Sequence, residues 1–263
     1  MATIAKTKQL VRMPRFGHRV DKTDPIMRGC VGWWPLNDGA GTKAKDIASD
    51  SYSGTLSASV TWDSTSLGTA PSWPGSDIDS DLGATWTDLG ITGGTTFSSS
   101  VWVYPTAPGG YVDNRGYIYA DGNPPALGWR VYKTSGTVNL WINSTAITLA
   151  GALTIDAWNH VCHVLDGTNS IFYVNGTAID TSSFSDALTA SGLVNLGNYS
   201  TTSRPFAGNI QNLRFYNRAL TATEVSRLYS EPWAGLEPLS PFSFFSGLSQ
   251  VYAYYSAAFL QRL

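Results

Sequence analysis

The sequence predicts an all-β fold of short antiparallel strands, and three observations support this prediction. Only 14% of the 263 residues are charged while 13% are aromatic, a composition that suits strands separated by turns. From Cys30 onward, short alternating or aromatic-rich runs recur between clusters of Gly, Asn, Asp and Pro. The chain also carries a single strong helix signal. A chain of this length can bury its own core as one domain with terminal extensions.

Ten segments have the pattern of strands: residues 31–36, 82–88, 96–104, 116–120, 127–133, 137–142, 157–165, 170–175, 192–196 and 207–217. In the segment from Phe97 to Tyr104, rings and branched side chains alternate between two faces, so one face is expected to line the core. The dipeptides Asp166-Gly167 and Asn175-Gly176 tolerate positive φ and predict tight turns, the second within a hairpin.

The helix signal begins at Thr221. Thr221 and Glu224 have the spacing of a capping box, in which a hydroxyl and a carboxylate each accept from an otherwise unpaired backbone N–H. Val225, Leu228 and Tyr229 then form one apolar face. Pro232 is expected to end the helix.

The two ends of the chain differ from its middle. Residues 1–28 carry seven basic and two acidic side chains, a net charge of +5, which leaves −7 for the rest of a chain whose net charge is −2. Such an arm either docks on an acidic surface or on phosphates, or serves as a solubilising tail. The aromatic tail after Pro232 either folds back or inserts into a partner. We therefore divide the chain into a basic arm (1–29), a sandwich (30–231) and a C-terminal tail (232–263).

Several classes of protein are disfavoured by what the sequence contains. Cys30 and Cys162 are the two cysteines, too few for a disulfide-dense scaffold or a four-cysteine zinc site, and whether they pair stays open. The net charge disfavours nucleic-acid binding by the protein as a whole. No apolar run has the length of a signal peptide or a membrane span, so we expect synthesis in the cytoplasm and no transmembrane segment.

Five motifs in sequence resemble the successive signatures of laminin-G-like domains of the concanavalin A-like lectin/glucanase type. They are Val31–Thr42 (VGWWPLNDGAGT), Phe97–Pro105, Trp158–Val161, Phe172–Gly176, and Phe206–Ile210 running on to Phe215–Thr221. The resemblance covers roughly residues 30–230. It implies a jelly-roll sandwich of two antiparallel sheets, with the first strand beside the last and a helix at the end. It also implies binding rather than catalysis in most members.

The residues themselves disfavour an enzyme. Glycoside hydrolysis requires two carboxyl groups beside the scissile bond, yet the three glutamates, Glu224, Glu231 and Glu237, lie in the closing helix or the tail. Asp77, Asp79, Asp81 and Asp88 form an Asp-rich stretch that suits a solvated loop or a cation site better than an acid–base pair. His160 and His163 are three residues apart on a strand, so they are expected on opposite faces.

Three sets of candidate site residues follow. Sugar binding would use aromatic faces, for which we select Trp73, Trp86, Trp129, Tyr132 and Trp141, although a tryptophan in a sandwich is more often core. The resemblance implies a calcium ion near the rim, for which Asp46, Asp50 and Gln211 are candidates, with the amide of Gln211 a weaker ligand than a carboxylate. Contacts with an assembly are expected from Arg12, Arg15, Arg19, Trp233, Phe242, Phe244, Phe245, Tyr254 and Tyr255.

These features predict a non-enzymatic display or adhesion protein whose ends attach to a larger assembly. The arm, the aromatic extension and the Glu231-Pro232-Trp233 stop resemble those of tailed-phage proteins, which implies a virion surface component, capsid-decorating or tail-associated, that touches host glycans. Other virion subunits and further copies of the chain are the expected partners. The alternative is a free carbohydrate-binding lectin, and a glycan hydrolase is the third class.

Overall fold

The computed structural model describes residues 18–76, 80–106, 115–121, 125–132, 135–198 and 204–238. In this part of the chain, eighteen strands, one 3-10 helix and one α-helix follow one another. They are β1 (His18–Val20), η1 (Pro25–Met27), β2 (Cys30–Trp34), β3 (Lys43–Lys45), β4 (Ser53–Thr55), β5 (Thr61–Thr65), β6 (Gly68–Pro74), β7 (Asp81–Thr85), β8 (Thr96–Pro105), β9 (Arg115–Ala120), β10 (Leu127–Tyr132), β11 (Val138–Ile142), β12 (Thr145–Leu149), β13 (Asn159–Asp166), β14 (Asn169–Val174), β15 (Thr177–Ser183), β16 (Leu193–Leu196), β17 (Ala207–Tyr216), α1 (Ala222–Ser230) and β18 (Leu236–Pro238). No helix within these ranges is both long and apolar enough to cross a membrane.

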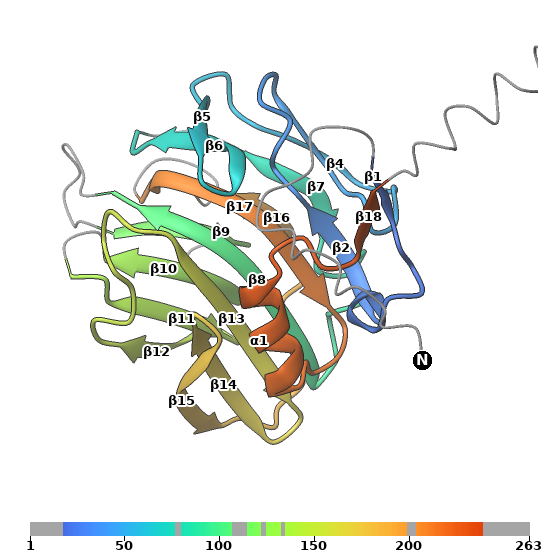
Figure 1. The fold of residues 1–263 in the computed structure, drawn as a ribbon. Coiled ribbons are helices and arrows are strands. Elements are labelled where there is room, and N and C mark those ends of the chain that lie inside the picture. Colours follow the sequence, from blue (N-terminus) through green and yellow to red (C-terminus); the bar gives the residue numbers. More distant parts are fainter. Residues whose placement is uncertain are drawn as a thin grey trace, which may run out of the picture.

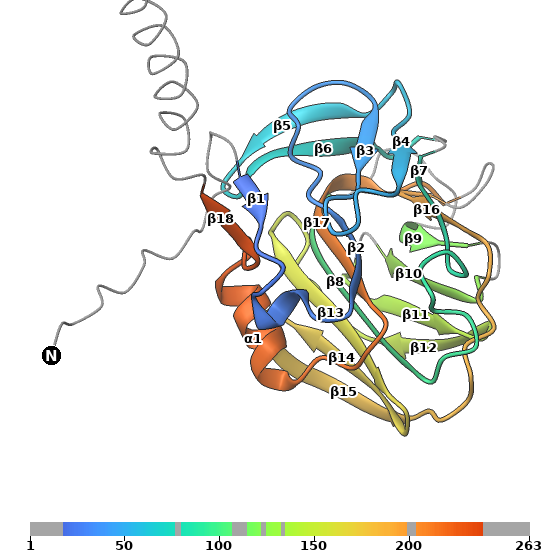
Figure 2. The ribbon, with the colours of Figure 1, turned by 90° about the vertical axis from the view of Figure 1, so that its right-hand side faces the viewer.

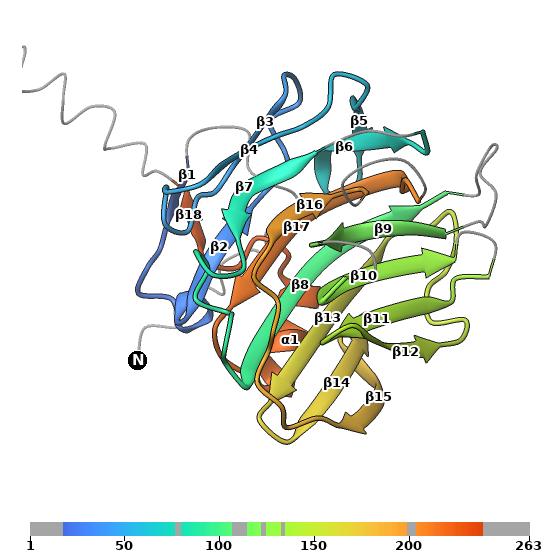
Figure 3. The ribbon, with the colours of Figure 1, turned by 180° about the vertical axis from the view of Figure 1, so that it is seen from behind.

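Two antiparallel sheets pack face to face, as the sequence predicts. One sheet has six strands in the order β12-β11-β10-β9-β16-β7 (Figure 3). The other has eight, in the order β15-β14-β13-β8-β17-β6-β5 with β2 paired to β17. The pairing of β2 with β17 places the first long strand beside the last one, which confirms the implied jelly-roll topology. Each of the ten predicted strand segments coincides with a strand of these sheets.

The main core fills the space between the two sheets. Trp86, Tyr119 and Phe215 lie at its centre, with ring centroids 5.0 to 5.8 Å apart in edge-to-face arrangements. All three side chains are fully buried. Such pairs contribute about 0.5–1.5 kcal/mol beyond the burial of their area. This central aromatic cluster therefore fixes how the two sheets sit on each other.

A second apolar cluster covers the outer face of the eight-stranded sheet. Helix α1 lies across this sheet and buries Val225 and Leu228 against it (Figure 1). The predicted capping box is present: the Thr221 hydroxyl accepts from the Glu224 backbone N–H, and the Glu224 carboxylate accepts from that of Thr221. Tyr229 stays 40% exposed while its ring stacks on Trp102 at 5.8 Å. One outer face of the sandwich is thus closed by the chain itself.

The packed part of the chain extends further at both ends than residues 30–231. Ile26, Met27 and Trp233 are buried in the second cluster. Strands β1 and β18 pair antiparallel, with Arg19 opposite Glu237, and form a two-stranded ribbon at one side of the sandwich (Figure 2). Residues 1–17 and 239–263 leave the described part of the chain from the two strands of this ribbon.

The predicted turns are confirmed. The Asp166 carboxylate accepts from the backbone N–H groups of Thr168 and Asn169 at 2.8 and 2.7 Å, which fixes the turn between β13 and β14. Asn175 and Gly176 have φ of 49° and 78°, the positive values that a type I′ hairpin turn requires.

The two cysteines are free thiols. In the eight-stranded sheet, β8 and β17 lie between the strands that carry Cys162 and Cys30. Three strand spacings amount to about 14 Å, whereas a disulfide requires Cα atoms within about 7 Å of each other. The fold therefore keeps these cysteines from pairing within one chain.

Candidate functional site

The outer face of the six-stranded sheet carries a cluster of aromatic and polar side chains. On β10, Arg130 pairs in register with Asn139 of β11 on one side and with Tyr117 of β9 on the other. Because side chains alternate along a strand, Trp129 points into the core while Arg130 points outward. Trp141, two residues after Asn139, lies on this same outer face.

The guanidinium of Arg130 lies at the centre of this cluster. Its Cζ atom is 5.4 Å from the ring centroid of Trp141, 5.7 Å from that of Tyr117 and 5.8 Å from that of Tyr132. Its Nε and Nη2 atoms donate to the Asn139 side-chain oxygen at 3.2 and 2.7 Å. Cation–π contacts and a forked hydrogen bond together hold the guanidinium in one orientation. We call Tyr117, Arg130, Tyr132, Asn139 and Trp141 the Arg130 cluster.

The Arg130 cluster is rigid at its base and open at its rim. Arg130 is 5% exposed and Asn139 is 3% exposed, and the Asn139 amide donates to the hydroxyl of Thr148 on β12 at 2.7 Å. Tyr132 and Trp141 are only half-buried, so each ring keeps accessible surface. Rings fixed from below and exposed above suit stacking against a flat apolar ligand face.

The structure separates the five aromatic residues selected from the sequence into two groups. Trp73, Trp86 and Trp129 are at most 1% exposed and belong to the core between the sheets, which leaves them no face for a sugar. The structure therefore removes these three from the candidate ligand-binding residues. Tyr132 and Trp141 lie together in the Arg130 cluster.

Sequence analysis missed Tyr117, Arg130 and Asn139. Arg130 and Asn139 occupy outward positions on strands that the sequence did predict, but the register between those strands was unknown. Tyr117 has the parity of the core residue Tyr119 and reaches the outer face because the register of β9 and β10 shifts between Trp129 and Arg130. With the register, positions 117, 130 and 139 fall side by side across three strands. The available signal was an arginine and an asparagine within otherwise apolar strands.

The residues proposed for calcium do not form one site. Asp46 is fully buried, and its carboxylate accepts from the backbone N–H groups of Trp33, Ala48 and Ser49 at 2.8 to 3.1 Å. Asp50 is exposed and pairs with Lys45 at 2.8 Å. Gln211 is buried and its amide donates to the Asn37 side chain and to the Thr69 carbonyl. Among the described residues, no three His, Cys, Asp or Glu side chains gather as metal ligands would.

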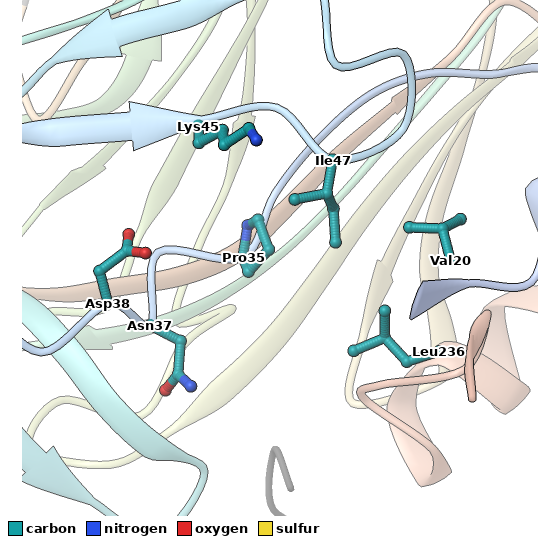
Figure 4. A pocket seen from close by; sticks show the side chains of 7 residues that line it. All are labelled: Val20, Pro35, Asn37, Asp38, Lys45, Ile47 and Leu236. Atoms are coloured by element: carbon teal, nitrogen blue, oxygen red, sulfur yellow. The ribbon is translucent and has the colours of Figure 1, made fainter. Parts of the chain in front are cut away.

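A cavity of about 230 Å³ lies where the terminal ribbon meets the loop after β2 (Figure 4). Val20 and Leu236 of the ribbon face Ile47 and Pro35 on its apolar side, and its polar side is lined by Asn37, Asp38 and Lys45. Burial raises the pKa of the Asp38 carboxyl. Among the described lining residues, Asp38 supplies one carboxyl group and Lys45 supplies one ammonium, which pairs with Asp50.

The three glutamates, and the aspartates of the Asp-rich stretch that the structure describes, have structural partners. Glu224, Glu231 and Glu237 pair with Arg218, Arg227 and Arg19, respectively. Asp81 accepts from the Gly83 N–H at 2.7 Å and Asp88 accepts from Thr85 at 2.9 Å, whereas Asp77 and Asp79 lie outside the described residues. These contacts place the three glutamates, Asp81 and Asp88 in turns, caps and ion pairs.

The two strand histidines point to opposite faces of the eight-stranded sheet, as predicted. His160 lies under α1, stacked with Tyr229 and tilted against Trp102. His163 faces the core beside Phe97 and Trp129. Burial lowers the pKa of each imidazole to about 3, so both are neutral at ordinary pH.

Of the residues predicted to contact an assembly, Arg19 and Trp233 lie in the described part of the chain. Arg19 is exposed and forms an ion pair with Glu237 across the terminal ribbon. Trp233 is 1% exposed in the second apolar cluster, so it stabilises the chain's own fold and offers no surface to a partner. The remaining seven, Arg12, Arg15, Phe242, Phe244, Phe245, Tyr254 and Tyr255, lie outside the described residues.

Solved structures of known proteins share this fold at low sequence identity. Trypanosoma rangeli sialidase matches with a TM-score of 0.60 and 15% identity over 79% of this chain, which corresponds to 33% of the sialidase. Domain 4 of AbnA, an extracellular arabinanase from Geobacillus stearothermophilus solved with arabinotriose, matches with a TM-score of 0.58 and 20% identity over 76% of this chain and 98% of that domain.

The binding domain of Paraclostridial Mosquitocidal Protein 1 matches with a TM-score of 0.59 and 13% identity over 78% of this chain and 52% of that one. A search of the curated proteins gives no matching sequence. The family model described as the concanavalin A-like lectin/glucanases superfamily matches residues 79–226, which is more than half of the chain. The chain therefore belongs to the concanavalin A-like lectin/glucanases superfamily.

Proposed function

We propose that this protein is a non-catalytic glycan-binding module and that the Arg130 cluster is its binding surface. The observation that carries the proposal is the position of two half-buried rings, Tyr132 and Trp141, around a buried guanidinium on the outer face of a sheet. The flat faces of sugar rings are apolar and pack against such aromatic surfaces, while the polar groups of the rim bind hydroxyls.

Two of the structural relatives support a binding role. The AbnA domain was solved in complex with arabinotriose, and the mosquitocidal protein match is a binding domain by name. The binding domain of botulinum neurotoxin serotype G also has this fold, with a TM-score of 0.57 and 16% identity. Low identity limits these likenesses to the fold, so the choice of ligand rests on the Arg130 cluster.

The absence of catalysis is part of the proposal. Hydrolysis of a glycosidic bond uses two carboxyl groups on either side of the bond. The side chains of the Arg130 cluster are aromatic, amide and guanidinium groups, and the three glutamates of the chain are held in ion pairs. These groups can bind and orient a sugar without transferring a proton to it.

Binding of oligosaccharides by matched variants tests this proposal. A glycan array that includes arabino-oligosaccharides identifies a ligand for the full chain, and calorimetry then measures its affinity. Trp141→Ala is expected to weaken binding by about two- to tenfold, because a stacked ring contributes roughly 0.5–1.5 kcal/mol. Trp158→Ala is the matched control, since Trp158 is also half-buried but packs against Tyr104 of the eight-stranded sheet.

Two outcomes would contradict the proposal. One is equal loss of affinity in Trp141→Ala and Trp158→Ala. The other is turnover of any bound oligosaccharide, which would make the chain an enzyme and move the search to Asp77, Asp79 and Asp81. A panel of polysaccharides incubated with the full chain and analysed for released sugar checks the second outcome.

We further propose that the module is displayed on a larger assembly, specifically as a virion surface protein, capsid-decorating or tail-associated, that is made in the host cytoplasm. The terminal ribbon supports display, because β1 and β18 bring both extensions to one side of the sandwich. A two-chain attachment at one point holds a domain more firmly than a single linker and leaves its other surfaces free. A free-standing lectin is the alternative.

Truncation distinguishes display from the lectin alternative. Deletion of residues 1–17 and 239–263 leaves the packed region 18–238 complete, unlike deletion to residue 28 or from residue 233, which would remove core side chains. Display predicts that the truncated chain loses self-assembly or particle attachment, seen by light scattering and electron microscopy, while glycan affinity is unchanged. The lectin alternative predicts the same assembly state with and without the extensions.

A further inference from the structure

Strand β12 forms an edge of the six-stranded sheet, with no described strand on its outer side. Its sequence, Thr145-Ala146-Ile147-Thr148-Leu149, contains no charged residue and no proline, and it pairs with β11 without a bulge. Natural edge strands are usually protected from pairing with another chain by charges, prolines or bulges. β12 has none of these protections.

The neighbouring edge strand, β15 of the eight-stranded sheet, is protected. Its pairing with β14 shifts register between Phe172 and Tyr173, and Asp180 lies at its centre. In an antiparallel pair formed about a twofold axis, the central residue of a strand lies opposite its own counterpart. Self-pairing of β15 would thus set two Asp180 carboxylates against each other, which is unfavourable. The centre of β12 is Ile147, which meets no such conflict.

The surroundings of β12 are also suited to a partner. A groove of about 390 Å³ runs along its end, lined by residues 148–152 and by Ile179 of β15. Ile179 is 45% exposed, so its apolar side chain is accessible beside the end of β12. Figure 3 shows β12 and β15 side by side along this margin of the sandwich.

The edge is held in place before any partner arrives. The turn between β11 and β12 consists of Asn143 and Ser144, with φ of 46° and 63°, as in a type I′ turn. The Asn143 side chain accepts from the Thr189 N–H and donates to the Ala187 carbonyl, both at 2.9 Å. A fixed edge loses less conformational entropy on pairing than a mobile one.

We propose that β12 pairs antiparallel with β12 of a second copy of this chain, about a twofold axis at Ile147. The pairing sets Thr145 opposite Leu149 and Ala146 opposite Thr148. The two six-stranded sheets then join into one continuous sheet. The second copy also covers the groove beside Ile179.

The joined sheet has a consequence that rests on the proposed function. Trp141 lies on β11, one strand inside the edge, so three strand spacings, about 14 Å, separate the β11 strands of the two copies. Both Arg130 clusters then lie on the same face. A glycan chain several sugars long can contact both clusters, which raises its apparent affinity through effective concentration.

Cysteine crosslinking of the full chain tests the pairing directly. Ile147→Cys places two thiols opposite each other at the twofold axis, within disulfide distance in an antiparallel pair. Mild oxidation is expected to give a covalent dimer on a non-reducing gel. Ala178→Cys, at an exposed position of β15, and the unsubstituted chain with its free Cys30 and Cys162 are the controls and are expected to stay monomeric on the gel.

Charge substitution supplies a second, independent measurement. Ala146→Lys is expected to raise the dissociation constant of the dimer about tenfold or more, since an edge lysine blocks strand pairing. Ala178→Lys, the same substitution on the protected edge, is expected to leave the dissociation constant unchanged. Light scattering over a dilution series measures the dissociation constant of each variant.

The inference is overturned if Ile147→Cys fails to crosslink, if Ala178→Cys crosslinks equally, or if both lysine variants dissociate alike. The proposed dimer and the proposed glycan site can fail independently in these experiments. Crosslinking without glycan binding removes the proposed function and leaves the dimer. Glycan binding by a chain that neither crosslinks nor dimerises removes the dimer alone.

Discussion

The outer faces of the two sheets show two uses of the same strand pattern. On the eight-stranded sheet, outward side chains are covered by α1, η1 and Trp233, and the polar groups among them bind segments of the chain itself. On the six-stranded sheet, outward side chains form the Arg130 cluster, with Tyr132 and Trp141 only half-buried. A face closed by its own chain serves stability, whereas an aromatic face with accessible rings is available for a ligand.

Arg214 on the closed face and Arg130 on the open face allow a direct comparison of the two faces. The largest expected effect is the loss of stability on substitution of Arg214. Arg214, fully buried, donates to the carbonyls of Pro232 and Ala234 at 2.8 Å and lies 3.6 Å from the ring centroid of Trp33. Arg214→Met is expected to lower the free energy of unfolding by about 3 kcal/mol. The substitution detaches the C-terminal segment and leaves the buried carbonyls of Pro232 and Ala234 without this donor. Urea denaturation measures this loss.

Arg130→Met is the counterpart on the open face. Arg130 contacts Asn139 and three rings of its own sheet, so these contacts join strands of a single sheet. We expect a smaller loss of stability and a clear loss of glycan affinity. Equal destabilisation by the two variants would mean that the two faces do not differ in the way proposed.

The pH dependence of stability is expected to come from the closed face and the core. Burial lowers the pKa of His160, with a further contribution from the charge of Arg214, and burial lowers that of His163, to about 3 in each case. An unfolded histidine titrates near 6.5, so the unfolded chain takes up protons below that pH while the folded chain does not. Stability is therefore full above pH 6.5 and is lost as the pH falls toward 3.

Between pH 7 and pH 5.5 the loss amounts to about 1 kcal/mol for each histidine. Denaturation at the two pH values, with His160→Gln and His163→Gln as comparison variants, checks this prediction. Each variant is expected to remove about half of the pH-dependent loss. A wild-type chain equally stable at both pH values would show that the imidazoles are not buried as neutral groups.

The comparison also explains how far the sequence alone could reach. The strands, the Asn175-Gly176 turn, the Thr221 cap and the opposed histidines follow from local periodicity and backbone preference, which depend on neighbours within a few residues. The burial of Trp73, Trp86 and Trp129 and the assembly of the Arg130 cluster depend on register between strands, which a single sequence does not specify. The packing of Ile26, Met27 and Trp233 was missed for a related reason, because its contacts join opposite ends of the chain.

Two tyrosines provide a sharper and smaller test of the comparison. Tyr229 stacks on Trp102 and His160 from α1, whereas Tyr132 packs against Arg130. Tyr229→Ala is expected to cost about 1 kcal/mol of stability without changing glycan affinity. Tyr132→Ala is expected to weaken binding while changing stability less. Thermal unfolding measures the stability of both variants, and calorimetry measures their glycan affinity. Loss of affinity in Tyr229→Ala with unchanged affinity in Tyr132→Ala would contradict the roles proposed for the two faces.

The last prediction is that calcium does not change the unfolding temperature of the protein. Asp46 lies at the closed side of the fold, and both of its oxygens already accept hydrogen bonds from Trp33, Ala48 and Ser49. A calcium ion would have to displace these donors, and the ion pair of Asp50 with Lys45 leaves that carboxylate already neutralised. Because a ligand that binds only the folded state raises its stability, thermal unfolding with calcium and with a chelator measures binding. A higher unfolding temperature in calcium would contradict this expectation, because it would show that the folded chain binds the ion through other ligands.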